Sequence, residues 1–152
     1  MRTHTKVIIG ALVVLVAVVA AIVWSTRSSA PVPQFQNRVA IPGQDPHPVS
    51  LWLDPAPATV GENRLTVQVA APEGGPVPAE EVAVYVFPEG EVPGEEIETT
   101  YTADAPIQDF LGTGHGFIAN VAVPEPGIWS VEVHFTIYGE SRTTTFEVEV
   151  SE

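Results

Sequence analysis

Cysteine is absent from this 152-residue sequence, and methionine occurs only as Met1. The absence of cysteine excludes disulfides, thiol nucleophiles, zinc–cysteine centres and blue-copper centres. The absence of further methionine excludes a methionine-rich Cu(I) site. The fold must therefore be stabilised by its core alone, and imidazole and carboxylate are the ligands left for a Cu(II) or Zn(II) ion.

Acidic residues are absent from the first 44 residues, which carry four bases. All 19 acids lie between Asp45 and Glu152, where Arg64 and Arg142 are the only lysine or arginine residues, so this part of the chain has a net charge of −17. Such a charge repels the phosphate backbone of nucleic acids and the surface of an anionic membrane. The sequence therefore predicts no nucleic-acid partner.

The longest uncharged run, Val7–Trp24, contains 18 residues and no proline. As a helix it would be about 27 Å long, close to the hydrocarbon thickness of a bilayer, about 30 Å. It predicts a transmembrane helix over 7–24. Arg2 and Lys6 precede this run and Arg27 follows it. This bias favours a single-pass protein of the cell membrane, with residues 1–6 in the cytoplasm and the C-terminal domain outside.

A cleaved signal peptide is the alternative interpretation of the same run, because "SSA" follows it at 28–30. Against cleavage, the run exceeds the usual 7–15 apolar residues, and Pro31 comes directly after the candidate site. Both interpretations export the rest of the chain. Residues 25–48 hold five prolines and few large apolar residues, which predicts an extended linker.

From Val49 onward, apolar and polar residues alternate with a period of two, and turn residues interrupt the pattern at short intervals. Trp129–Phe135 is the clearest case, and "YGES" at 138–141 predicts a hairpin turn into a return strand. The same pattern recurs in "VSLWLDP", "NRLTVQVAAP", "EVAVYVFP", "EIETTYT" and "GFIANVAVP". The sequence therefore predicts an all-β domain over 49–152, a seven-stranded immunoglobulin-like β-sandwich without a disulfide.

Two stretches carry a family resemblance: "PAPATVGENRLTVQV" at 55–69 and "GHGFIANVAVPEPGIWSVEV" at 114–133. Together with one N-terminal span before a single sandwich, they resemble the FixH-like/YtkA-like family of membrane-attached immunoglobulin-like domains, which are related in fold to copper-binding CopC proteins. The resemblance covers about residues 49–150. It implies an extracytoplasmic accessory or binding domain in copper handling or oxidase assembly, with copper as its ligand and a membrane protein complex as its partner.

Three histidines are candidate metal ligands: His115, His134 and His47. His4 precedes the predicted span and would lie in the cytoplasm. Imidazole suits Cu(II) or Zn(II), but no His-x-His spacing joins these residues. The alternative is that His134 and His115 are solvent-exposed or loop residues and that His47 ends the linker. The sequence is compatible with a shared metal site and with three separate histidines.

No sequence pattern indicates an enzyme. There is no GxSxG nucleophile elbow, and "GTGHG" at 112–116 opens a strand rather than a helix, so it cannot hold a phosphate by helix geometry. The glutamates of Pro88–Glu98 indicate either a Ca²⁺-binding loop or a solvated acidic loop. The competing function is therefore a metal-free structural or adhesive module that interacts with other proteins.

Aromatic residues outside the apolar stripe suggest where such a module would bind. Trp52, Tyr85 and Phe87 point away from the predicted core face. They form either an exposed docking surface or a face that Phe35 and Val39 of the linker cover.

Overall fold

The computed structural model describes residues 32–152 except for 76, 78 and 107–112. The cytoplasmic segment predicted over 1–6 and the transmembrane helix predicted over 7–24 lie outside these residues. None of the described residues belongs to a helix long and apolar enough to cross a bilayer.

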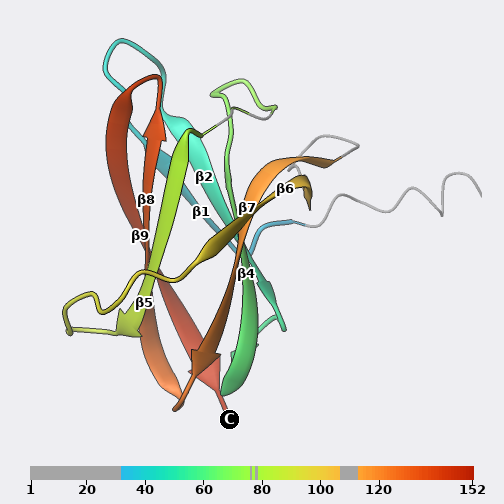
Figure 1. Cartoon of the computed structure of the whole chain (residues 1–152), viewed down its shortest axis with the longest axis vertical. Helices are drawn as coiled ribbons and strands as arrows, with labels where there is room; N and C mark the ends of the chain where they lie inside the picture. The colour runs from blue at the N-terminus through green and yellow to red at the C-terminus, as the bar shows by residue number, and fades with distance from the viewer. Residues whose placement is uncertain (1–31, 76, 78, 107–112) are drawn as a thin grey trace, which may run out of the picture.

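The described chain is all-β and forms two packed sheets (Figure 1). A five-stranded sheet has the order β1-β2-β4-β7-β6, and a four-stranded sheet has the order β3-β9-β8-β5. The strands are β1 (Phe35–Val39), β2 (His47–Asp54), β3 (Ala58–Thr59), β4 (Gly61–Val69), β5 (Glu81–Pro88), β6 (Thr99–Pro106), β7 (Thr113–Val123), β8 (Gly127–Ile137) and β9 (Glu140–Ser151).

Alternating apolar residues from both sheets enclose one core, as the period of two predicts. In β8, Trp129, Val131, Val133 and Phe135 are all buried, whereas His134 is exposed. Strand β9 alternates strictly between buried and exposed residues from Thr143 onward. The clearest strands in the sequence are therefore confirmed.

Strand β1 lies inside the segment predicted to be a linker over 25–48. Its residues Phe35 to Val39 pair in antiparallel register with Leu51 to His47 of β2. Phe35 and Val39 pack against the core, and the Asn37 side chain donates a hydrogen bond of 2.9 Å to the Thr145 carbonyl of β9. The linker therefore does not extend to residue 48, because β1 is a strand that contacts both sheets.

The described residues contain nine strands, whereas the sequence predicted seven. Besides β1, the additional strand is β3, two residues that pair in parallel with β9. Neither β1 nor β3 has a long apolar alternation, so each depends on the strand beside it rather than on a local pattern.

The predicted hairpin turn at 138–141 is present as a two-residue loop, Tyr138 and Gly139, after the last pair of Ile137 with Glu140. Both loop residues have positive φ, 52° and 74°. Such angles suit the twist of a β-hairpin and are ordinary for glycine but uncommon for tyrosine. The Tyr138 ring packs edge-on against His47, with ring centroids 5.9 Å apart.

The outer face of the five-stranded sheet is covered at its β6 end. The register of β6 on β7 shifts between Thr102 and Ala105, and this bulge brings Ala105 over Gly116. A Cβ at Gly116 would lie 2.4 Å from the Ala105 Cβ, so only glycine permits this approach. Trp52, on the same face, is only 6 % exposed.

Candidate functional site

His47 is the first residue of β2, and its side chain points into the core. It is completely buried, and its Nδ1 lies 3.0 Å from the Asp45 carbonyl oxygen. Because a carbonyl only accepts hydrogen bonds, Nδ1 carries the proton in this contact. Nε2 is also buried and has no hydrogen-bond partner among the described residues.

His115 lies near the start of β7, on the five-stranded sheet. Its imidazole is exposed, stacks on the Tyr101 ring with centroids 5.6 Å apart, and its Nδ1 contacts the Tyr101 hydroxyl. Tyr101 also packs edge-on against Phe117. The Tyr101 ring of β6 is therefore the aromatic partner of His115.

His134 lies on the outer face of the four-stranded sheet, as its position in the alternation predicts. Its side chain is 46 % exposed, and its Nε2 lies 2.5 Å from Oε1 of Glu132. The Tyr85 ring from the adjacent strand β5 is tilted against it, with centroids 5.0 Å apart. One imidazole and one carboxylate therefore converge here.

These three environments do not form one site. His47 is enclosed in the core, His115 belongs to the five-stranded sheet, and His134 belongs to the four-stranded sheet. No group of three or more histidine and acidic side chains close enough to hold a metal ion occurs in the described part of the chain. The three histidines therefore do not share one three-ligand centre among the described residues, and a copper site at any of them stays a prediction.

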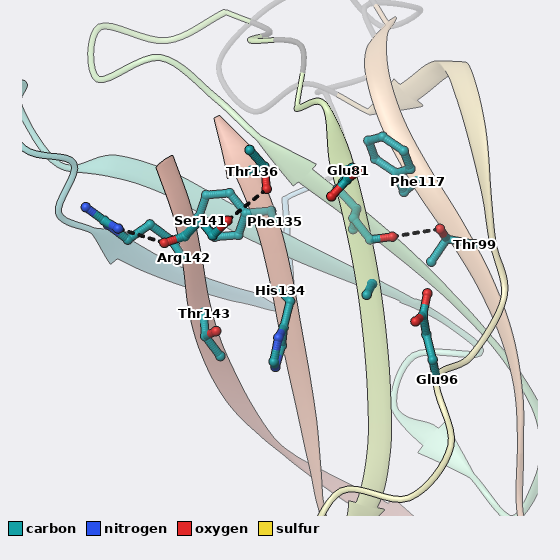
Figure 2. A pocket seen from close by; sticks show the side chains of 12 residues that line it. Glu81, Glu96, Thr99, Phe117, His134, Phe135, Thr136, Ser141, Arg142 and Thr143 are labelled. Atoms are coloured by element: carbon teal, nitrogen blue, oxygen red, sulfur yellow. Dashed lines mark hydrogen bonds between the residues drawn. The ribbon is translucent and has the colours of Figure 1, made fainter. Parts of the chain in front are cut away.

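A hollow of about 670 Å³ adjoins His134 where strands β5, β8 and β9 lie side by side (Figure 2). The small side chain of Ala83 lies opposite His134 in the register of β5 with β8. Hydroxyl groups of Thr136, Ser141 and Thr143 line the hollow on one side of β5, and Glu96 and Thr99 line it on the other.

Among the described charged side chains that line this hollow, Arg142 has ion-pair and hydrogen-bond partners, whereas two glutamates have no ion-pair partner. Arg142 donates to the Ala40 carbonyl at 3.1 Å and to the Ser141 carbonyl at 2.7 Å, and it pairs with Glu140 at 3.1 Å. Glu81 and Glu96 are exposed and have no ion-pair partner among the described residues. The hollow therefore presents two carboxylates that no described cation neutralises.

The aromatic residues outside the apolar stripe do not form one exposed surface. Trp52 and Phe87 are buried, and Tyr85 is half-buried beside His134. Phe35 and Val39 pack against the core through β1. The alternative in which they cover Tyr85 and Phe87 is therefore not what the structure shows.

Sequence reasoning missed the hollow itself. The alternation in β5 places Glu81, Ala83 and Tyr85 on one face, and this signal was present in the sequence. Glu96 reaches the same place from the segment after β5, where the Ile97 amide donates to the Val84 carbonyl at 2.8 Å. No local sequence pattern predicts this contact between the segment and β5.

Comparison with known proteins adds no relative. Neither a scan against protein-family models nor a search of curated proteins finds a match for this chain. The resemblance to FixH-like/YtkA-like domains therefore stays a prediction.

Proposed function

We propose that this chain is a non-enzymatic binding domain, an immunoglobulin-like sandwich that its N-terminal apolar segment holds on the outer side of the cell membrane. The observation that carries the proposal is the open outer face of the four-stranded sheet. The outward residues of β9 from Ser141 to Glu149 are all exposed. Beside them, imidazole, carboxylate and hydroxyl groups surround the hollow at His134.

A sheet face suits recognition because its side chains are held in register by the ladder beneath them. The ladder of β8 with β9 runs from Gly127–Val150 to Ile137–Glu140 without a break. A partner that binds this face therefore contacts side chains whose positions are already fixed. This reduces the conformational entropy lost on binding. A membrane protein complex is the class of partner that an anchored domain would meet.

Site-specific crosslinking in intact cells tests this proposal. A photo-crosslinking amino acid at Thr145, on the outer face of the four-stranded sheet, is compared with one at Asn120, on the outer face of the five-stranded sheet; both positions are exposed. We expect a discrete adduct from position 145 and none from position 120. Adducts of equal yield from both positions, or none from either, would contradict the proposed binding face.

Copper handling is the second candidate, since the His134–Glu132 pair supplies two of the ligand types that Cu(II) accepts. Calorimetric titration of the full chain in mild detergent with Cu(II) and Zn(II) tests it, beside the variant His115→Ala/His134→Ala. For a recognition domain we expect no submicromolar site that depends on these histidines. A submicromolar site that vanishes in the variant would instead establish metal handling.

A further inference from the structure

We propose that the hollow beside His134 binds a lysine or arginine side chain that a protein partner presents. This inference rests on the proposed function and names the chemistry of the partner. It is drawn from the shape of the hollow, its unpaired carboxylates, its hydroxyl groups and the charge of the whole domain (Figure 2).

The shape follows from one small residue among larger ones. Along the outer face of β5, Ala83 lies between Glu81 and Tyr85, and it faces His134 across the ladder. A methyl group at this position leaves space that a larger side chain would fill. The resulting hollow of about 670 Å³ can accept a long side chain with the backbone that carries it.

The charge of the hollow favours a cation. Glu81 and Glu96 line it without an ion-pair partner among the described residues. Arg142 is the only lysine or arginine among the described residues that line it, and its guanidinium is already bound to Glu140 and to two carbonyls. A cation from outside would therefore meet free carboxylates.

The hydroxyl groups suit the same ligand. Thr136 Oγ1 and Ser141 Oγ lie 3.2 Å apart on the outer face, and Thr143 lies near them on β9. A guanidinium has five N–H donors and no acceptor, so it needs several oxygen acceptors arranged around it. The Glu81 and Glu96 carboxylates, together with these hydroxyl oxygens, provide them.

The partner is expected to bind the face of the sheet rather than its edge. Strand β5 ends the four-stranded sheet, but two of its outward carbonyls are already engaged. The Val82 carbonyl accepts from the Thr99 hydroxyl at 2.9 Å, and the Val84 carbonyl accepts from the Ile97 amide at 2.8 Å. Addition of a peptide strand at this edge would have to displace these bonds, whereas a side chain can enter the hollow without displacing them.

The net charge of the domain favours some possible ligands of the hollow over others. With 19 acids and two arginines between Asp45 and Glu152, a second copy of the domain or an anionic lipid headgroup is repelled, while a basic segment is attracted over long range. A basic protein segment is therefore the occupant that the observations favour.

The test uses a blocked nine-residue peptide with arginine at alternate positions, so that an extended chain presents its arginines on one side. Its binding to the full chain in neutral detergent is measured by fluorescence anisotropy at low ionic strength, about 20 mM, where screening is weak. The control peptide carries citrulline, which is uncharged, in place of each arginine. We expect the arginine peptide to bind and the citrulline peptide not to bind.

Two matched double variants locate the binding. We expect Glu81→Gln/Glu96→Gln to weaken binding of the arginine peptide about tenfold, since two ion pairs are lost. Glu147→Gln/Glu149→Gln removes the same charge from exposed positions on the same outer face but outside the hollow, and should weaken it less than about twofold. The substitution Ala83→Leu, which fills the hollow without a change of charge, should also weaken binding.

Equal losses in both double variants would overturn the proposal, because binding would then follow net charge alone. Absence of binding by the wild-type chain, or unchanged binding in Ala83→Leu with a normal unfolding midpoint, would overturn it too. If the peptide fails but position 145 still forms its adduct in cells, the proposed binding domain stands and only its basic ligand is wrong. If the peptide binds as expected and position 145 forms no adduct, the cation site stands, and the proposal that a membrane partner occupies this face in cells is wrong.

Discussion

At the scale of single residues, the imidazole of His47 is held between the start of β2 and the turn of the β8–β9 hairpin. Its Nδ1 contacts the Asp45 carbonyl and its ring packs against Tyr138, while Nε2 is buried without a described partner. An unpaired buried nitrogen costs about 1–3 kcal/mol, which the burial of the ring must offset. The role of His47 in the described structure is therefore to fill this end of the core.

This arrangement predicts that replacing each of the three histidines with alanine changes the free energy of unfolding by a different amount. We expect His47→Ala to lower the free energy of unfolding by about 2–4 kcal/mol, because it leaves a cavity in the core. His115→Ala and His134→Ala should each change it by less than about 1 kcal/mol, since both side chains are exposed. Urea denaturation of residues 32–152 and of each variant measures the difference. A cost for His47→Ala as small as that for the exposed histidines would contradict the structural role of His47.

The difference between the buried His47 and the two exposed histidines also affects the choice of variant for the metal titration. A variant that replaces all three histidines would lose stability at His47 as well as any ligands, so a lost binding signal would be ambiguous. For this reason the decisive variant replaces only His115 and His134, and His47→Leu, which retains an apolar side chain in the core, serves as a separate control.

At the scale of elements, the five-residue strand β1 is important for stability because it contacts both sheets. It pairs with β2, and Asn37 donates hydrogen bonds of 2.9 Å to Thr144 Oγ1 and to the Thr145 carbonyl of β9. Phe35 packs against Phe146 with ring centroids 6.4 Å apart. Strand β1 therefore closes one edge of the five-stranded sheet and ties it to the four-stranded sheet.

Removal of β1 tests this role. We expect a fragment of residues 45–152 to be less stable than one of residues 32–152 by about 3 kcal/mol or more, because it loses the β1–β2 ladder and the buried side chain of Ile41. Denaturant midpoints and slopes of the two fragments give the comparison. In the longer fragment, Asn37→Ala should cost about 1–2 kcal/mol through the two lost hydrogen bonds. Identical midpoints for the two fragments would mean that β1 contributes nothing to the fold.

At the scale of the whole molecule, repulsion between negative charges destabilises the compact folded state. The part of the chain from Asp45 onward carries −17, whereas among the described residues one arginine–carboxylate ion pair, Arg142–Glu140, is found beside the His134–Glu132 contact. Carboxylates that face one another across a folded surface repel each other more than in an extended chain. Screening of this repulsion should therefore favour the folded state.

Salt dependence of the melting temperature checks this expectation. An increase in sodium chloride from about 0.01 M to about 1 M shortens the screening length from about 30 Å to about 3 Å. We expect the melting temperature of residues 32–152 to rise by several degrees over this range. The variant Glu147→Gln/Glu149→Gln should melt higher at low salt and respond less. A melting temperature that is constant or falls with salt would show that repulsion is not the dominant charge effect.

Much of the strand structure could be predicted from the sequence because alternation is a local signal. Trp129 to Phe135 in β8, the return strand β9 and the turn at Tyr138–Gly139 are all present where the pattern places them. The exposed position of His134 follows from the same alternation. Along a strand, the period of two decides which side chains face the core, whatever the neighbouring strand is.

The tertiary structure alone decided which distant residues meet. The burial of His47, the pairing of β1 and the contact of Asn37 with β9 all depend on strand order and register, which a period of two does not specify. The hollow at His134 arises in the same way, because Ala83, Ser141 and Glu96 come from three separate segments. By itself the sequence determined the all-β class, the main core residues and the acidic charge, since these follow from composition and local alternation. Its candidate binding surface depends on contacts between strands, and those exist only once the two sheets have assembled.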